Sequence, residues 1–469
     1  MSNRRYRVTW ALFCWLAVAG LCGTEVGRAA TPAEQPVSDF PLGVYWPWER
    51  TNGGAKHAGL EPWEFVKQTC DLLKASGVDA IWVVNIDVQD AKKLLKITQA
   101  TGIKVVPCLG EIEIRNRPQT AKVVPDDPQS LEQAIDYYRK TVPQVMQAIG
   151  DDRKGIMAWV LGDEPSGNAM ALVEPMRKIF AEADPDHPLM TVSMWPQTPT
   201  LIEQTRLTTF CVDLYPFFGP NDPNGPHTPA ASANFFTSNI QRMVDAAGKD
   251  GRVGWVMPQC FNEIWGPWEM RADGVSVALP GSYYHWRTPT EGEMRWQTWE
   301  ALRCGAKGMF FFVLLAQERG NPDAKPVDDP SIKDIVMKTP TVVGYDALLD
   351  FRGRPTPQFN ILAQLYRKLS QHKPLLRRLA PSSDAWLTVD AGAPIGCFID
   401  PTTKDRYAFV VNADMAAGKT VHATAASSVA GLVDVLEGRQ MNWDAATSAD
   451  THRATITFEA GSGVLLKAN

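Results

Sequence analysis

The sequence predicts a (β/α)8 barrel followed by a small antiparallel β-sandwich. Between about residues 40 and 374, short apolar runs alternate eight times with longer amphipathic stretches. The turns that enter the apolar runs are short, whereas the segments that leave them are long, as in barrel enzymes. After about residue 375 the apolar runs are short, β-rich and separated by turn residues, which is typical of a sandwich.

Each predicted strand is a compact apolar run bounded by polar or turn residues. The eight runs are 42–46, 80–86, 104–109, 156–161, 189–194, 210–215, 253–258 and 309–314. Helical patterns lie between them, at 62–75, 88–101, 130–149, 169–183, 232–247 and 290–304. Glycine follows several of these helices, as at Gly102 and Gly305, because it accepts the left-handed conformation that ends a helix. Thr290 and Glu293 form a capping-box pattern at the start of the last helix.

The chain divides into four predicted segments. Residues 1–30 resemble an export signal, because three arginines precede an apolar run that is short for a membrane span. Residues 31–39 form a flexible leader, residues 40–374 the barrel and residues 375–469 the sandwich. We therefore expect export to the periplasm or the extracellular space, with no membrane association after cleavage. The sequence predicts no particular oligomeric state.

Composition argues against several classes of function. The net charge of −5 offers no basic stripe for nucleic acid. The seven histidines show no HxH or HxxxH spacing, so no metal site is expected, and no phosphate-binding glycine loop or GxSxG motif predicts a cofactor or a serine nucleophile. The sixteen tryptophans favour a carbohydrate partner, because flat indole faces can serve as platforms for sugar rings.

The apolar run 156–161 ends abruptly in two adjacent carboxylates, Asp163 and Glu164. Pro165 and a helical pattern follow, so the two acids are expected at the carboxyl end of the fourth strand, where barrel enzymes carry their active sites. The same residues would also suit an ordinary helix start, where acidic side chains are favoured by the helix dipole. Their position at a barrel strand end favours catalysis.

Other strand ends bring acidic, amide and aromatic residues to the same edge. The predicted substrate-binding residues are Tyr45, Trp46, Trp48, Asn85, Glu111, Glu113, Trp195, Asp213, Tyr215, Gln259, Trp265 and Trp268, with Trp286 as a further platform candidate. Carboxylates in a tryptophan-rich cleft suit glycoside cleavage, in which one carboxyl protonates the leaving oxygen and another supports positive charge at the sugar carbon. We therefore expect a glycosidase acting on oligo- or polysaccharides, with Glu164 as general acid/base and Glu263 as a candidate nucleophile. The alternative is a carbohydrate-binding barrel without catalytic activity.

Residues 40–370 resemble the (β/α)8 glycoside hydrolases of the retaining clan that includes β-galactosidases. In that clan the acid/base Glu follows the fourth strand, as Glu164 does, but Asn precedes it and a nucleophilic Glu ends the seventh strand. This chain has Asp163 and Gln259 at those positions. The adjacent Asp–Glu pair is similar to substrate-assisted β-N-acetylhexosaminidases, in which the Asp orients the acetamido group of the substrate. The resemblance therefore leaves two roles open for Asp163: orienting Glu164 or assisting such a group.

Overall fold

The computed structural model describes residues 35–112, 127–165, 169–222, 225–248, 251–266, 268–270, 276–278, 280, 282–316, 343–444 and 451–469. The predicted export signal and the start of the leader lie outside these residues. Within them, no helix is both long and apolar enough to cross a membrane.

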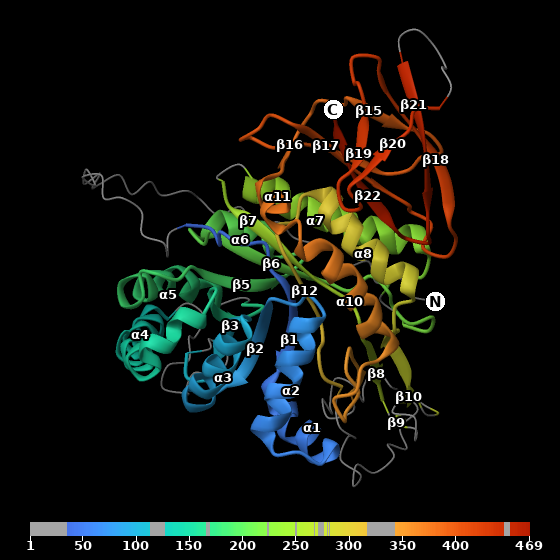
Figure 1. The fold of residues 1–469 in the computed structure, drawn as a ribbon. Helices are drawn as coiled ribbons and strands as arrows, with labels where there is room; N and C mark the ends of the chain where they lie inside the picture. Colours follow the sequence, from blue (N-terminus) through green and yellow to red (C-terminus); the bar gives the residue numbers. More distant parts are fainter. Residues whose placement is uncertain are drawn as a thin grey trace, which may run out of the picture. The chain divides into compact units, whose positions relative to one another are not determined.

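Eight parallel strands form the central sheet, in the order β3-β2-β1-β12-β7-β6-β5-β4 (Figure 1). They are β1 (Leu42–Pro47), β2 (Ala80–Ile86), β3 (Lys104–Leu109), β4 (Trp159–Asp163), β5 (Leu189–Met194), β6 (Thr209–Leu214), β7 (Val253–Pro258) and β12 (Met309–Phe311). A parallel bridge between Val105 and Ile156 joins β3 to β4, and the Met157 amide donates to the Val105 carbonyl at 2.8 Å. This contact closes the sheet, and the predicted eight-stranded parallel architecture is confirmed.

The fourth strand differs most from its predicted range. Its ladder with β5 begins at the pair Trp159–Leu189 and extends to Asp163, whereas the apolar run begins at Ile156. Ile156 forms a single bridge to β3, and the pairing with β5 begins three residues later, at Trp159. Asp163 is therefore the last residue of β4 and is still paired within the sheet, whereas Glu164 follows the strand.

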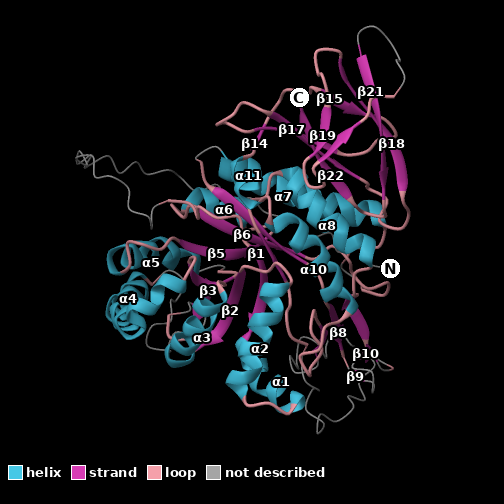
Figure 2. Ribbon diagram, in the orientation of Figure 1, coloured by secondary structure: helices cyan, strands magenta, loops and turns pink. Residues whose placement is uncertain are grey.

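Helices cover the outer face of the sheet (Figure 2). They are α1 (Thr51–Ala58), α2 (Pro62–Ala75), α3 (Val88–Thr101), α4 (Pro128–Ile149), α5 (Met170–Ala183), α6 (Thr198–Gln204), α7 (Pro229–Gly248), α8 (Glu291–Cys304), α10 (Pro357–Ser370) and α11 (Lys373–Arg378), with 3-10 turns η2 (Trp48–Arg50) and η4 (Gly150–Gly155). The capping box of α8 is confirmed, since Thr290 Oγ1 accepts from the Glu293 amide at 3.3 Å and Glu293 accepts from the Thr290 amide at 2.8 Å. Gly102 and Gly305 end α3 and α8 with positive φ, as predicted.

A small antiparallel sheet follows β7 at the carboxyl end of the barrel strands. It consists of β11 (Tyr283–Trp286), β8 (Asn262–Trp265) and β13 (Val343–Asp346), in that order. A two-stranded ribbon of β9 (Trp268–Met270) and β10 (Ser276–Ala278) extends from it. The sequence predicts only a long segment here, and the structure adds these strands to it.

The C-terminal region contains two further antiparallel sheets, as predicted. One has the order β14-β16-β17-β22-β19-β20 and the other β15-β18-β21. Their strands are β14 (Ala380–Pro381), β15 (Leu387–Val389), β16 (Ile395–Ile399), β17 (Arg406–Val411), β18 (Lys419–Ala426), β19 (Leu432–Asp434), β20 (Arg439–Met441), β21 (Thr451–Phe458) and β22 (Gly463–Ala468). Residues of both sheets, such as Val410 and Val421, belong to one buried apolar cluster. The assembly of these sheets as a sandwich stays a prediction.

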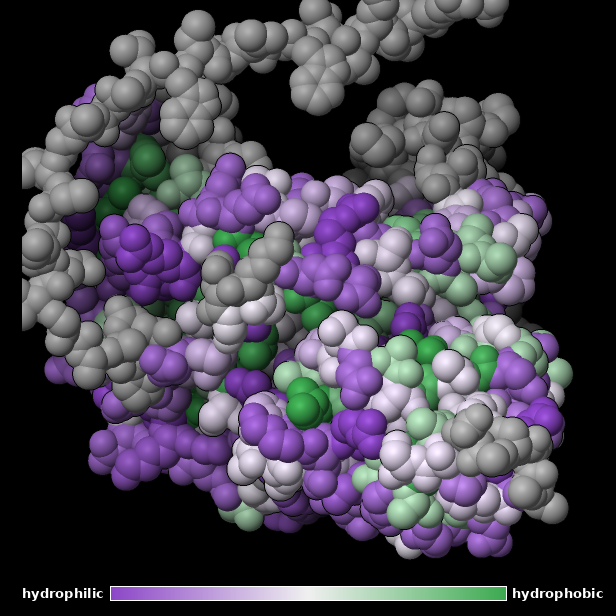
Figure 3. Space-filling view, turned by 90° about the horizontal axis from the view of Figure 1, so that it is seen from above, coloured by the Kyte–Doolittle hydropathy of each residue, from purple (hydrophilic) through white to green (hydrophobic). Residues whose placement is uncertain are grey.

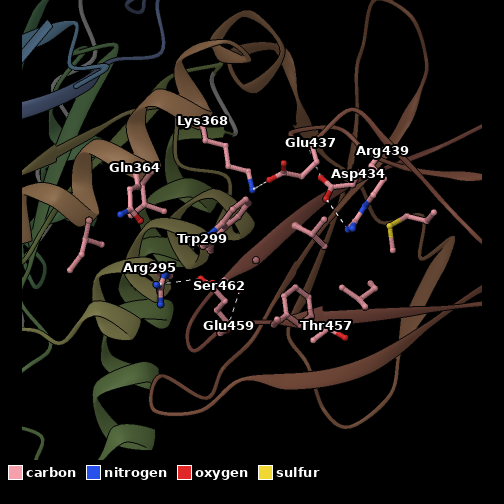
Figure 4. Close-up of a pocket in the computed structure, with 17 residues that line it drawn as sticks. Arg295, Trp299, Gln364, Lys368, Asp434, Glu437, Arg439, Thr457, Glu459 and Ser462 are labelled. Atoms are coloured by element: carbon pink, nitrogen blue, oxygen red, sulfur yellow. Dashed lines mark hydrogen bonds and ion pairs between the residues drawn. The ribbon is translucent and has the colours of Figure 1, made fainter. Parts of the chain in front are cut away.

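A cleft of about 570 Å³ lies between α8, α10 and strands β19 to β22 (Figure 4). Ion pairs cross it, between Lys368 and Glu437 and between Arg295 and Glu459, the second at 3.3 Å. The Lys368 ammonium also lies 5.9 Å from the centre of the Trp299 ring. The charged groups of this cleft thus bind one another and connect the barrel helices to the C-terminal strands.

Candidate active site

A cavity of about 160 Å³ lies at the carboxyl end of the barrel strands. Its lining residues are Tyr45, Asp163, Glu164, Val192, Asp213, Tyr215, Met257, Phe261, Glu263, Trp286 and Phe312. Seven of them were expected from the sequence and come from five separate segments, namely Tyr45, Asp163 with Glu164, Asp213 with Tyr215, Glu263, and Trp286. The structure therefore brings the central part of the predicted acidic and aromatic site together.

Asp163 and Glu164 both line this cavity, although successive side chains of a regular strand point to opposite faces. Two backbone features account for this. The ladder between β4 and β5 shifts register between Val160 and Asp163, as in a β-bulge. Glu164 then has φ = 48°, in the left-handed region that residues other than glycine seldom adopt, and its amide donates to the Val192 carbonyl at 3.1 Å. Strain of this kind costs about 1–3 kcal/mol and concentrates at functional sites.

The Asp213 carboxyl is hydrogen-bonded to Glu164. Burial, this bond and the negative charges of Glu164 and Asp163 raise the pKa of Asp213 well above its ordinary value. The carboxyl of Asp213 therefore keeps a proton in a pH range where an exposed aspartate has lost it. Asp213 is therefore the donor in its hydrogen bond with Glu164.

Aromatic side chains form the wall around the carboxyls. The Tyr215 ring meets Phe261 edge-on at 4.9 Å and Trp286 at 5.2 Å, and Phe312 lies 4.8 Å from Tyr45. Burial and the neighbouring carboxylates raise the pKa of Tyr215 well above its ordinary value, so its hydroxyl stays protonated. Trp286 Nε1 is buried and has no hydrogen-bond partner among the described residues, which makes it a candidate donor to a substrate oxygen.

Glu263 reaches the cavity from the small sheet and not from a barrel strand. It lies in the middle of β8, opposite Trp286 of β11 and Tyr345 of β13, and it is 6% exposed. The indole Nε1 of Trp265 donates a hydrogen bond to its carboxylate. This bond fixes the orientation of the second predicted catalytic acid.

Two predicted substrate-binding residues, Trp46 and Gln259, are fully buried and are not among the residues that line the cavity. Trp46 is 0% exposed, belongs to the layer between strands and helices, and donates from Nε1 to Thr51 at 3.1 Å. Gln259 is also 0% exposed; its amide accepts from the Phe217 amide at 2.9 Å and donates to the Arg287 carbonyl at 2.8 Å. Gln259 thereby ties the segment after β6 to the segment after β11.

Further predicted residues lie outside the cavity lining. Trp48 donates to Asp90 at 3.1 Å. Asn85 is exposed with φ = 57° and donates to Glu49 at 3.3 Å. Glu111 accepts from the Val88 amide at 2.9 Å, at the start of α3.

The remaining predicted residues are tryptophans and one glutamate. Trp195 is 40% exposed and meets Phe235 edge-on at 5.5 Å. The Trp265 ring is stacked on His285. Glu113 and the side chain of Trp268 lie outside the described residues.

Four lining residues were not predicted from the sequence: Val192, Met257, Phe261 and Phe312. Val192, Met257 and Phe312 lie inside predicted apolar strand runs, so hydrophobicity alone does not separate them from the core. Their position at the carboxyl ends of predicted strands was the one available signal.

No protein-family model matches the sequence, and no curated protein matches it significantly. Several solved structures are similar at low identity. They include a β-galactosidase from the psychrophilic Marinomonas ef1 (13% identity, 70% of this chain and 59% of that chain, TM-score 0.48) and an exo-β-1,4-mannosidase from Opitutaceae bacterium strain TAV5 (14%, 72% and 60%, 0.46). A β-glucuronidase from Ruminococcus gnavus is 11% identical over 70% of this chain, with a TM-score of 0.47, and the match spans half of its length. Likenesses at this level identify neither a family nor an activity, so the chemistry of the cavity alone has to indicate the function.

Proposed function

We propose that this chain is an exported glycoside hydrolase that acts on oligo- or polysaccharides. The observation that carries the proposal is the cavity at the barrel mouth, in which Glu164 and the protonated Asp213 lie beside two further carboxyls within an aromatic wall. Glycoside cleavage needs a proton for the leaving oxygen and negative charge for the sugar carbon. Both are supplied by side chains of this one cavity.

Glu164 is the proposed general acid/base. In the first step the proton held by Asp213 passes through Glu164 to the glycosidic oxygen, which leaves with the departing alcohol. Negative charge then remains on the carboxyls of the cavity and favours the positively charged sugar carbon. When water attacks, the pair regains a proton from it, which restores the starting state.

Two acids remain as candidates for the second role. Glu263, oriented by Trp265, would act as nucleophile or as base for water. Asp163 would instead orient an acetamido group of the substrate, in which case no enzymic nucleophile is needed. Comparing Glu263→Gln with Asp163→Asn on aryl glycosides with and without a 2-acetamido group separates these mechanisms. Loss of activity on both substrate types in the Glu263 variant favours the nucleophile.

Exposed apolar groups beside the cavity support an extended substrate. Met194 is the registered neighbour of Asp213 in the β5–β6 ladder, and Trp195 follows it. These two are the large hydrophobic side chains that stand exposed among the described residues, at 37% and 40%. On the face drawn in Figure 3, by comparison, hydrophobic and hydrophilic residues are interspersed. An exposed indole directly after the end of β5 suits a second sugar ring.

The test compares Glu164→Gln with Glu111→Gln, which alters a carboxylate of a neighbouring strand end that lies outside the cavity lining. The kcat of Glu164→Gln should fall about 10²–10⁴-fold on glycosides with a poor leaving group. It should fall much less on dinitrophenyl glycosides, whose leaving group needs no proton. The Glu111 variant should retain activity. Full hydrolysis by Glu164→Gln refutes the proposal, and glycan binding by a wild-type protein without turnover on a broad panel favours the inactive sugar-binding barrel.

A further inference from the structure

A buried acid–histidine pair lies behind Glu263, and the proposed chemistry does not use it. Asp222 follows β6, and its side chain is fully buried. Its Oδ2 lies 2.5 Å from Nδ1 of His285 in β11. Because a carboxylate only accepts, Nδ1 donates this bond. Burial lowers the pKa of His285 below its ordinary value, against the opposing effect of Asp222, which favours the neutral imidazole.

The His285 ring contacts two indoles that serve the cavity. It is stacked on Trp265, with ring centres 4.0 Å apart and an interplanar angle of 24°. It also lies 4.0 Å from the Trp286 ring, tilted by 55°. Trp265 donates to the Glu263 carboxylate, and Trp286 lines the cavity directly. One imidazole therefore sets the position of both indoles.

The backbone around this pair is closely packed, so Asp222 has a fixed position. The Gly219 amide donates to the His285 carbonyl at 3.1 Å, and the Asp222 amide donates to the Gly219 carbonyl at 3.1 Å. A side chain at residue 219 would place its Cβ 2.0 Å from the Tyr284 carbonyl oxygen. The segment after β6 thus meets β11 at a distance that only glycine permits. The acid is held against His285 by the backbone as well as by its own hydrogen bond.

We propose that Asp222 and His285 are positioning residues for the glycosidase reaction, which orient Glu263 through Trp265 and hold Trp286 at the cavity wall. The inference rests on the proposed function. Groups behind a reacting side chain act by restricting it to the productive geometry, and their loss commonly costs 10–100-fold in activity. A fixed Trp265 keeps its N–H directed at the same carboxylate oxygen, so the other oxygen remains directed for the reaction.

The chain offers a matched control for a purely structural role. His187 and Asp184 form a second pair, with Nδ1 3.0 Å from both carboxylate oxygens and an Asp184 side chain that is 2% exposed. This pair is not among the residues that line the cavity. Replacing His187 therefore removes a similar buried hydrogen bond without touching Glu263 or either indole.

The experiment measures kcat, KM and Tm for wild type, His285→Leu and His187→Leu, together with the Trp265 indole NMR signal, assigned with Trp265→Phe. We expect His285→Leu to lower kcat about 10–100-fold with little change in KM and to shift that signal. His187→Leu should lower Tm without either effect. Asp222→Asn, which still offers an acceptor to Nδ1, should lose less kcat than Asp222→Ala.

Three outcomes overturn the inference. A wild type with turnover in which His285→Leu loses no more kcat than His187→Leu refutes the positioning role while leaving the proposed function intact. An unchanged Trp265 signal in His285→Leu refutes the coupling between the two rings. A wild type without turnover on the whole glycoside panel refutes the proposed function, and the positioning role with it.

Discussion

Replacing Asp213 by Asn removes a proton-binding group while keeping its shape and its ability to donate to Glu164. In the wild type the pKa of Asp213 is raised by burial and by Glu164, so the folded protein keeps a proton that the unfolded chain releases above about pH 4. A group whose pKa is raised by folding stabilises the folded protein fully at pH values below its unfolded-state pKa. This contribution is lost as the pH rises toward its folded-state pKa. Each such pH unit lowers the free energy of unfolding by about 1.4 kcal/mol.

The variant lacks this loss, so its stability relative to the wild type should increase with pH. Between pH 5 and pH 7 the gain amounts to at most about 2.7 kcal/mol, which is two units of the linkage slope. Urea unfolding at pH 5, 6 and 7 measures it directly. Parallel curves for the wild type and Asp213→Asn would refute the raised pKa of Asp213.

Asp400 provides a control of opposite sign. Its hydrogen bond with Arg378 lowers the pKa of Asp400. Asp400 therefore stabilises the folded protein at pH values above its unfolded-state pKa, and this contribution disappears as the pH falls. Asp400→Asn should therefore change the pH dependence of stability in the acid range and leave the interval from pH 5 to 7 unchanged. The same experiment on both variants separates a specific effect of the cavity from a general effect of removing an acid.

Three further outcomes are expected. Gly219→Ala should lower the free energy of unfolding by about 1–3 kcal/mol in thermal melts, because its Cβ would lie 2.0 Å from the Tyr284 carbonyl oxygen. Gly110→Ala, whose Cβ would meet nothing within 4 Å, should leave the free energy of unfolding unchanged. Trp195→Ala should raise KM for an oligosaccharide about 5–30-fold by removing one aromatic contact worth about 1–2 kcal/mol, while KM for an aryl monoglycoside stays unchanged in the same kinetic assay. Aryl uronides should have at least about tenfold lower kcat/KM than neutral glycosides, because the titratable side chains that line the cavity in the described part of the chain are acids and tyrosines. Equal kcat/KM values for the two substrate types would contradict this electrostatic argument.

The eight barrel strands could be predicted because a buried parallel strand is an apolar run with clear ends. The range of β2 agrees at both ends with its run 80–86, as does that of β5 with its run 189–194. The small sheet at the barrel mouth could not be predicted in this way. Its strands contain interspersed polar and aromatic residues, and β13 pairs with β8 across a long separation in sequence. Such pairing depends on contacts that no local pattern contains.

The sequence predicts a site residue well where a charged residue marks the end of a strand. It does not predict whether a side chain on the strand points toward the cavity or away from it. Tyr45 and Trp46 are neighbours on a regular strand, so one faces the interior of the barrel and the other the helices. The sequence does not say which. Asp163 and Glu164 are also neighbours but share one side, because the bulge and the positive φ of Glu164 break the alternation. A strand pattern alone predicts neither outcome.

The left-handed backbone of Glu164 means that the fold is less stable than it could be. Glycine adopts this conformation without steric cost, so a chain selected for stability alone would favour it at position 164, and Glu164→Gly would remove most of the strain. A side chain that persists where the backbone disfavours it has to be retained for some other benefit. A screen for more stable variants would therefore tend to replace the residue on which the proposed activity depends. Resistance to heat and loss of turnover would then arise from one and the same substitution.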